Sequence, residues 1–267
     1  MSENHTKNED YILPDSDDES KRLERQARLY GAAAFIDPCL TPDVCAVAEL
    51  GCGSGYFTNY AAGSLSNAMV VGLDIDSKRI EFAKGLYTAP NLSFKVGDLT
   101  DLPFDANTFD LVFTRFVLVH YPDPAEALKE MIRVVRPGGT IVAYDMIHSG
   151  VWFSPAKPAF QRVLKAAMDV MRERGMEPDQ GLHLPVAFKR AGLKNMKSEI
   201  VPHSSMTPDP LFEDYLDNWA KTIEGICEIL ATGFDQDIVE KACAELLPSK
   251  EPTFLVEITV LVSGEVA

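Results

Sequence analysis

The spacing of apolar residues divides the chain into two parts with different periodicities. Between residues 44 and 143, apolar runs of strand length alternate with segments of helical periodicity. Crossovers of this length bring successive strands in parallel, and nearly continuous apolar strands indicate helices on both faces of the sheet. This part therefore predicts an α/β fold with a doubly wound, mostly parallel sheet. The expected strands are 44–50, 69–74, 92–96, 111–113 and 140–143.

After Asp145 the pattern changes to long amphipathic helices. Apolar stripes predict helices over about 155–175 and 208–233, with a short helix and turn over 185–193 between them. A strand is expected over 197–202. Apolar residues at alternate positions predict an antiparallel last strand with one dry face, made of Phe254, Val256, Ile258, Val260 and Val262. We expect the two long helices to form a lid.

Composition restricts the class of protein further. The chain has 267 residues, of which 46% are hydrophobic and 24% charged, which is typical of a soluble globular protein. Its net charge of −15 disfavours nucleic acid and anionic membranes and favours a small-molecule substrate. Five cysteines without a CxxC pair, and no apolar run of signal-peptide or membrane-spanning length, predict a cytoplasmic protein without membrane insertion.

The most specific motif follows the first predicted strand. Gly51, Gly53 and Gly55 are spaced two residues apart in ELGCGSGYF, where missing side chains let the backbone turn sharply and approach a ligand. The third glycine falls one residue too early for the GxGxxG pattern, which disfavours a nicotinamide cofactor and hence an oxidoreductase. The next strand ends at Asp74, where a carboxylate can accept hydrogen bonds from a ribose diol.

Four such segments, in order and spacing, resemble the class I S-adenosylmethionine-dependent methyltransferases, particularly the ubiquinone and menaquinone biosynthesis branch. They are 49–55, 74–75 with 97–99, 109–120, and 133–139. The resemblance implies a Rossmann-like sheet of seven strands with an antiparallel last strand. It also implies that the glycine turn and Glu49 hold the methionine part of the cofactor, and that Asp74 binds the ribose. Ile75, Asp98 and the amide of Leu99 would contact the adenine.

The resemblance further assigns an N-terminal helix with Gln26 to the methionine end of the cofactor. The implied set of cofactor-binding residues is Gln26, Glu49, Gly51, Cys52, Gly53, Asp74, Ile75, Gly97, Asp98, Leu99, Arg115 and Phe116. Each has a structural alternative: Asp98 can cap its own turn, and Arg115 can pair with an acid while its backbone contacts the ligand. His120 and His148 are candidate bases, although the structural alternative for His120, fixing its loop, is the favoured one.

The expected organisation follows from these motifs. Residues 1–15 form a flexible tail, and 16–43 a helical cap that begins with a capping box at Ser16 and Glu19. Residues 44–147 form the S-adenosylmethionine-binding core. Residues 148–267 supply the helical lid insertions and the last two strands of the same sheet.

The predicted activity is methyl transfer from S-adenosylmethionine to an O, N or C nucleophile of a small, partly apolar metabolite. No metal is expected, because the carboxylate set of magnesium-dependent catechol methylation is absent from the strand ends. A protein of the same fold that binds the cofactor without methyl transfer, as a cyclase or a regulator, is the alternative. A homodimer is compatible with the sequence.

Overall fold

The computed structural model describes residues 17–30, 33–121, 123–230, 236–247 and 251–267. The expected tail and Ser16 of the capping box lie outside these ranges. Within them, no helix is both long and apolar enough to cross a membrane.

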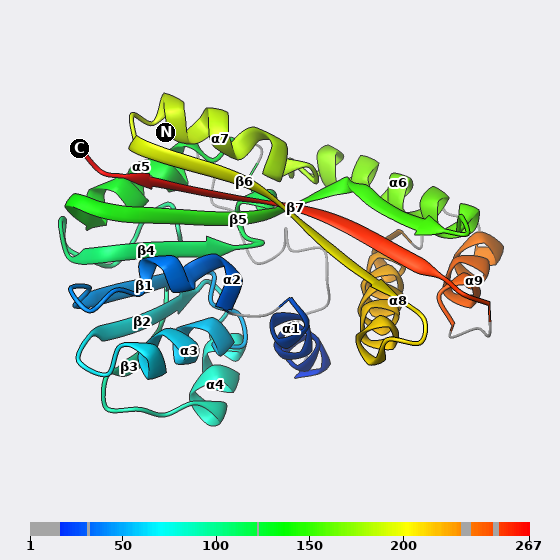
Figure 1. Cartoon of the computed structure of the whole chain (residues 1–267), viewed down its shortest axis with the longest axis horizontal. Coiled ribbons are helices and arrows are strands. Elements are labelled where there is room, and N and C mark those ends of the chain that lie inside the picture. Colours follow the sequence, from blue (N-terminus) through cyan, green and yellow to red (C-terminus); the bar gives the residue numbers. More distant parts are fainter. Residues whose placement is uncertain (1–16, 31–32, 122, 231–235, 248–250) are drawn as a thin grey trace.

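One sheet of seven strands organises the molecule (Figure 1), in the order β3-β2-β1-β4-β5-β7-β6. The strands β1 to β5 pair in parallel, whereas β7 lies antiparallel to both β5 and β6. This arrangement confirms the predicted fold class, including the antiparallel last strand. The bounds are β1 (Ala46–Leu50), β2 (Met69–Asp74), β3 (Leu92–Val96), β4 (Phe109–Arg115), β5 (Val135–Ser154), β6 (Lys194–Met206) and β7 (Phe254–Glu265).

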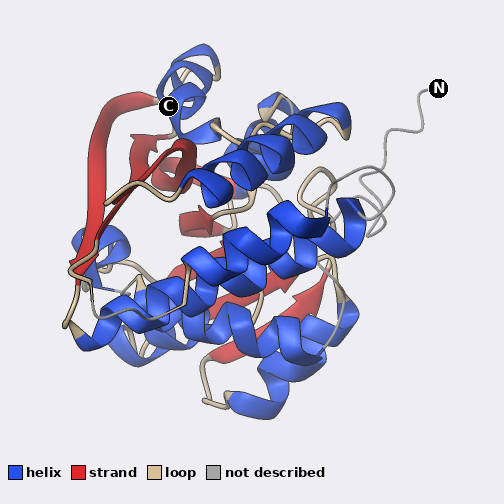
Figure 2. Ribbon diagram, turned by 90° about the vertical axis from the view of Figure 1, so that its right-hand side faces the viewer, coloured by secondary structure: helices blue, strands red, loops and turns tan. Residues whose placement is uncertain are grey.

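Helices cover both faces of the sheet (Figure 2). The helices α2 (Ala33–Ile36), α3 (Tyr56–Ser64) and α4 (Ser77–Leu86) pack on one face, and α5 (Ala125–Val134) and α7 (Gln180–Arg190) pack on the other. The first helix, α1 (Asp17–Leu29), lies beside the ends of the parallel strands, with α3 and α4 on one side and α8 (Pro210–Leu230) on the other (Figure 1).

Beyond these strand ends, β5, β6 and β7 continue as a long extension. A second apolar core joins this extension to α6 (Pro158–Glu173), α8 and α9 (Gln236–Glu245). The stripe predicted for α6 is confirmed by its buried residues, which include Phe160, Val163 and Leu164. The helix α9 was missed, because its apolar stripe is short.

The prediction for β5 was too short, since the strand continues to Ser154. Its pairing with β7 shifts register between Ile147 and Trp152, and the polar residues there break the apolar pattern. A side chain at Gly150 in this irregular stretch would lie 2.9 Å from the Cβ atom of Ile258. The register shift therefore needs a glycine at this position. In the sequence pattern alone, this glycine indicates the end of a strand.

The predicted dry face of β7 is wrong over its first half. Leu255, Glu257 and Thr259 are buried there, whereas Phe254 is 40% exposed. The strand lies between two others, so different stretches of its two faces are covered. Val260 and Val262 pack in the core that includes α7, while Leu255 belongs to the second core.

The packing of α7 on the sheet can be tested by a pair of substitutions. Phe188→Ala should lower the free energy of unfolding by about 3–5 kcal/mol, because its side chain is fully buried. Val186→Ala on the same helix, where the side chain is 52% exposed, should change it by less than about 0.5 kcal/mol. Urea denaturation measures both, and equal losses would contradict the described packing.

Candidate functional site

A hollow opens where the parallel strands end beside α1. It contains about 1060 Å³ not filled by protein atoms, part of it open to solvent, which is enough for a nucleotide-sized ligand. Its walls come from the loops after β1, β2, β3 and β4 and from Leu23, Gln26 and Ala27 of α1. The loops meet here because parallel strands present their carboxyl ends at one edge of the sheet.

The glycine turn after β1 forms the floor of the hollow. Gly51, Gly53 and Gly55 have φ values of 73°, 51° and 81°, a region that other residues rarely adopt. A Cβ atom on Gly51 would lie 2.2 Å from Val117, so the turn packs directly against the segment after β4. At Gly53 the nearest atom to an added Cβ is Leu23 Cδ1 at 3.5 Å, so this glycine leaves space below α1.

Asp74 connects this turn to the end of β2. Its Oδ2 atom accepts a hydrogen bond from the Gly53 amide at 2.8 Å, and its Oδ1 atom accepts one from the Asp76 amide at 3.0 Å. The carboxylate is 4% exposed. Burial raises the pKa of the Asp74 carboxyl, and Arg79, whose Nη1 lies 3.9 Å away, opposes that shift. Asp74 therefore orders the turn and also presents a carboxylate to the hollow.

Glu49 brings a second buried carboxyl to the hollow. It is 2% exposed and accepts a hydrogen bond from the Thr58 hydroxyl. Burial raises the pKa of Glu49 to about 8, while Thr58 and Arg115 act in the opposite direction. A cationic group bound beside this carboxyl would stabilise its ionised form.

Arg115 and Phe116 form the wall at the end of β4. The Arg115 guanidinium lies over the rings of Phe57 and Phe116, 4.7 and 4.5 Å from their centroids. Its Nη1 atom is buried and makes no hydrogen bond to the described residues of the chain, and burial lowers the pKa of Arg115 to about 10. Because an unpaired buried donor is costly, an anionic ligand group in the hollow would be stabilised here. This donor, the glycine turn and the two carboxyls fit an amino-acid and ribose ligand such as S-adenosylmethionine.

Nearly all the residues expected at the site line this hollow. They are Gln26, Glu49, Gly51, Cys52, Gly53, Asp74, Ile75, Gly97, Leu99, Arg115, Phe116 and His120. Asp98 is not part of the lining, and its Oδ1 atom accepts hydrogen bonds from the amide and hydroxyl of Thr100, both at 2.8 Å. His148 is not part of the lining either, and its Nδ1 atom contacts the Pro178 carbonyl.

Burial lowers the pKa of His120 to about 4, with Arg79 and His148 contributing. The ring is therefore neutral at physiological pH and a weak base.

Some residues that line the hollow were not predicted from the sequence. They are Leu23, Ala27, Ser54, Tyr56, Phe57, Leu73, Arg79, Val117 and Tyr121. Of these, Arg79 carried a signal, because it follows Asp76 by three residues, on the helix after the strand that ends at Asp74.

Comparisons with known proteins agree with this geometry. Residues 48–143 match a family described as a methyltransferase domain. The phthiotriol/phenolphthiotriol dimycocerosates methyltransferase of Mycobacterium tuberculosis is 31% identical over 159 residues, which is 55% of this chain and 58% of the relative. The tocopherol O-methyltransferase of Arabidopsis thaliana is 35% identical over 38% of this chain and 30% of its own length. The chain thus spans less than two thirds of the curated relatives it matches.

Solved structures share the fold over nearly the whole chain. A geranyl diphosphate methyltransferase in complex with S-adenosylmethionine matches with a TM-score of 0.55 and 17% identity, covering 95% of this chain and 92% of its own. The [4+2]-cyclase SpnF matches with a TM-score of 0.53 and 16% identity, covering 90% and 82%. The domain match includes the strand ends that build the hollow, and residues 48–143 therefore carry a methyltransferase domain.

Proposed function

We propose that this protein transfers a methyl group from S-adenosylmethionine to an O, N or C nucleophile of a small, partly apolar metabolite. The observation that carries the proposal is the hollow at the strand ends of the matched domain. In it, the carboxyls of Glu49 and Asp74 and the unpaired Nη1 of Arg115 surround a glycine turn. These groups complement the amine, ribose and carboxylate of the cofactor.

Each group has a distinct role in binding. Asp74 accepts hydrogen bonds from the ribose hydroxyls, Glu49 pairs with the amine, and Arg115 donates to the carboxylate. Ile75 and Leu99, which line the hollow, contact the adenine. When bound, S-adenosylmethionine supplies a methyl group that is already activated by its sulfonium charge. The chain's main contribution is therefore to orient both partners and to exclude water, with α1 as the cover.

The names of the relatives support an apolar acceptor. They include a phthiotriol/phenolphthiotriol dimycocerosates methyltransferase, a tocopherol O-methyltransferase and an ajmaline N-methyltransferase. A cytoplasmic protein is our further proposal, and it agrees with the free thiols of Cys39, Cys45, Cys52 and Cys243. We also propose a homodimer as the state to be tested by sedimentation.

Ribose recognition can be tested at Asp74. Asp74→Ala should weaken binding of both S-adenosylmethionine and S-adenosylhomocysteine by about 10-fold to 100-fold, because a charge-assisted contact to a diol is lost and the turn loosens. Calorimetry measures both affinities. Asp101→Ala, an exposed carboxylate on a neighbouring loop, is the control and should change neither. If the Asp74 variant binds both ligands as tightly as the wild-type protein, Asp74 does not bind the ribose.

The elevated pKa of Glu49 generates a pH prediction. With a pKa of about 8, the free protein holds Glu49 protonated at pH 6 to 7. An amine-bearing ligand stabilises the ionised form, so its binding releases a proton and its affinity should rise with pH, by up to about tenfold per unit below pH 8. Calorimetry of S-adenosylhomocysteine between pH 6 and 8 measures this slope.

Glu49→Gln should bind more weakly at pH 8 and lose that slope. Glu126→Gln, at an exposed site on α5, should keep the wild-type slope. If the affinity of the Glu49 variant still rises with pH, the proton released on binding comes from another group.

Methyl transfer itself is tested with methyl-labelled S-adenosylmethionine and the small-molecule fraction of the source cells. We expect the label to appear in an apolar metabolite whose mass identifies the acceptor. A protein that binds the cofactor but leaves all label on it favours the cyclase or regulatory alternative. A protein that binds neither S-adenosylmethionine nor S-adenosylhomocysteine refutes the proposal.

A further inference from the structure

A buried carboxylate outside the cofactor-binding residues lies on β7. Glu257 is 0% exposed. Its Oε2 atom accepts a 2.6 Å hydrogen bond from the Tyr30 hydroxyl, and its other oxygen accepts one from the Trp219 indole. Within the described part of the chain, no lysine or arginine forms an ion pair with it. Two neutral donors compensate poorly for burying a charge, and burial raises the pKa of Glu257 to about 7.

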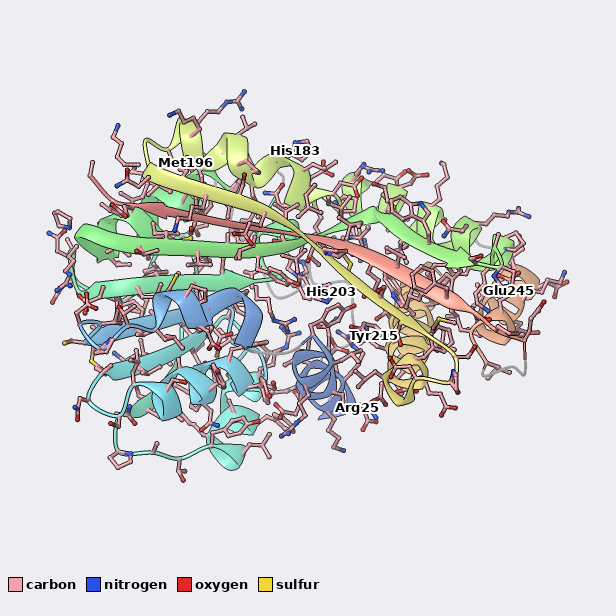
Figure 3. All side chains as sticks on the ribbon, viewed as in Figure 1. Arg25, His183, Met196, His203, Tyr215 and Glu245 are labelled. Carbon is pink, nitrogen blue, oxygen red and sulfur yellow. The ribbon has the colours of Figure 1, made fainter. Side chains whose placement is uncertain are left out.

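The groups around Glu257 come from four further elements. Tyr30 follows α1, Tyr215 and Trp219 belong to α8, Tyr144 lies on β5, and His203 lies directly opposite Glu257 on β6. Figure 3 shows His203 and Tyr215 in the region between β6, α1 and α8. His203 Nε2 is hydrogen-bonded to the Tyr144 hydroxyl, and Thr259 lies 2.8 Å from that hydroxyl. The polar groups of this cluster therefore form hydrogen bonds with one another, inside a core that is otherwise apolar.

Tyr30 connects this cluster to the cofactor hollow. Its ring contacts three others edge-to-face, with centroid distances of 5.6 Å to Phe116, 4.9 Å to His203 and 5.6 Å to Tyr215. Phe116 also lines the hollow, so one ring separates the hollow from Tyr30. The φ of Phe116 is 56°, an unfavourable value for a bulky residue that is found most often at functional sites.

The Tyr30 side chain thus lies next to the cofactor hollow. Its ring packs between other aromatic rings, and its hydroxyl donates a hydrogen bond to the carboxylate of Glu257. We propose that Tyr30 occupies the methyl acceptor's subsite in the free protein, that the acceptor is a hydroxylated ring, and that Glu257 accepts its hydroxyl proton. This inference rests on the proposed methyltransferase function. If Tyr30 only held this end of α1 in place, a buried carboxylate would not be needed. Apolar contacts pack helices together without the free-energy cost of removing a charge from water.

The reaction balances with these groups. The Phe116 ring, which separates Tyr30 from the hollow, must turn aside so that the acceptor oxygen reaches the methyl carbon. The acceptor's hydroxyl proton then passes to Glu257, and the acceptor oxygen forms a bond to the methyl carbon. The bond from that carbon to sulfur breaks, and its electron pair stays on sulfur. A carboxylate whose pKa is near neutrality suits this proton transfer at physiological pH.

The subsite is tested first by binding. Tyr30→Ala should open a site that binds 4-methylphenol at least about tenfold more tightly than toluene, its analogue without a hydroxyl, because a hydrogen bond to a carboxylate contributes roughly this preference. Calorimetry in the presence of S-adenosylhomocysteine measures both probes. Adding Glu257→Leu should remove the preference and retain toluene binding. Equal binding of the two probes to the folded Tyr30→Ala protein overturns the subsite.

Turnover provides the second test, and it uses variants that preserve the packing. The wild-type product should be an O-methyl ether, and Glu257→Gln should lower its rate of formation by at least about 100-fold with unchanged affinity for S-adenosylhomocysteine. Tyr30→Phe should keep or raise kcat/KM, because the competing hydroxyl is gone. An N-methyl or C-methyl product, or a loss in Tyr30→Phe as large as in Glu257→Gln, overturns the inference.

These outcomes are separable from failure of the proposed function. If wild-type protein transfers label to no metabolite, methyl transfer fails while the preference for 4-methylphenol still reports on the subsite. If label is transferred to nitrogen or carbon, the proposed function stands and this inference alone fails.

Discussion

The hydrogen bond from the Gly53 amide to the Asp74 carboxylate joins the ends of two neighbouring strands, and the site depends on it. It holds the glycine turn after β1 against the end of β2, where the amides of Gly51 and Cys52 also donate to the Leu73 carbonyl at 2.7 and 2.9 Å. A carboxylate at that strand end thus has two functions. It orders the turn, and it presents an acceptor to a ligand that lies over the turn.

The fold and the cofactor half of the site were predictable because both depend on local patterns. Alternating strands and helices predict that successive strands run parallel, and the carboxyl ends of parallel strands meet at one edge of the sheet. Gly53, Asp74 and Arg115 lie at those ends, so the sequence places them together without knowledge of the packing. Asp98 also follows a strand, β3, and His148 lies within the long strand β5, but their side chains contact Thr100 and the Pro178 carbonyl outside the hollow.

The proposed acceptor subsite was not predictable, because it is assembled from distant segments. Glu257 lies in a strand whose alternating pattern indicated the opposite face as buried, and its partners Tyr30 and Trp219 are 227 and 38 residues away. No spacing in the sequence signals such a contact. The long extension of β5, β6 and β7 creates it by carrying a second core past the strand ends.

Calorimetric titration of the wild-type protein measures whether the hollow binds S-adenosylmethionine. We expect one binding site per chain for S-adenosylhomocysteine, with a dissociation constant on the order of micromolar. We also expect S-adenosylmethionine to compete for the same site. If neither ligand binds to the folded protein, the hollow is not a cofactor site.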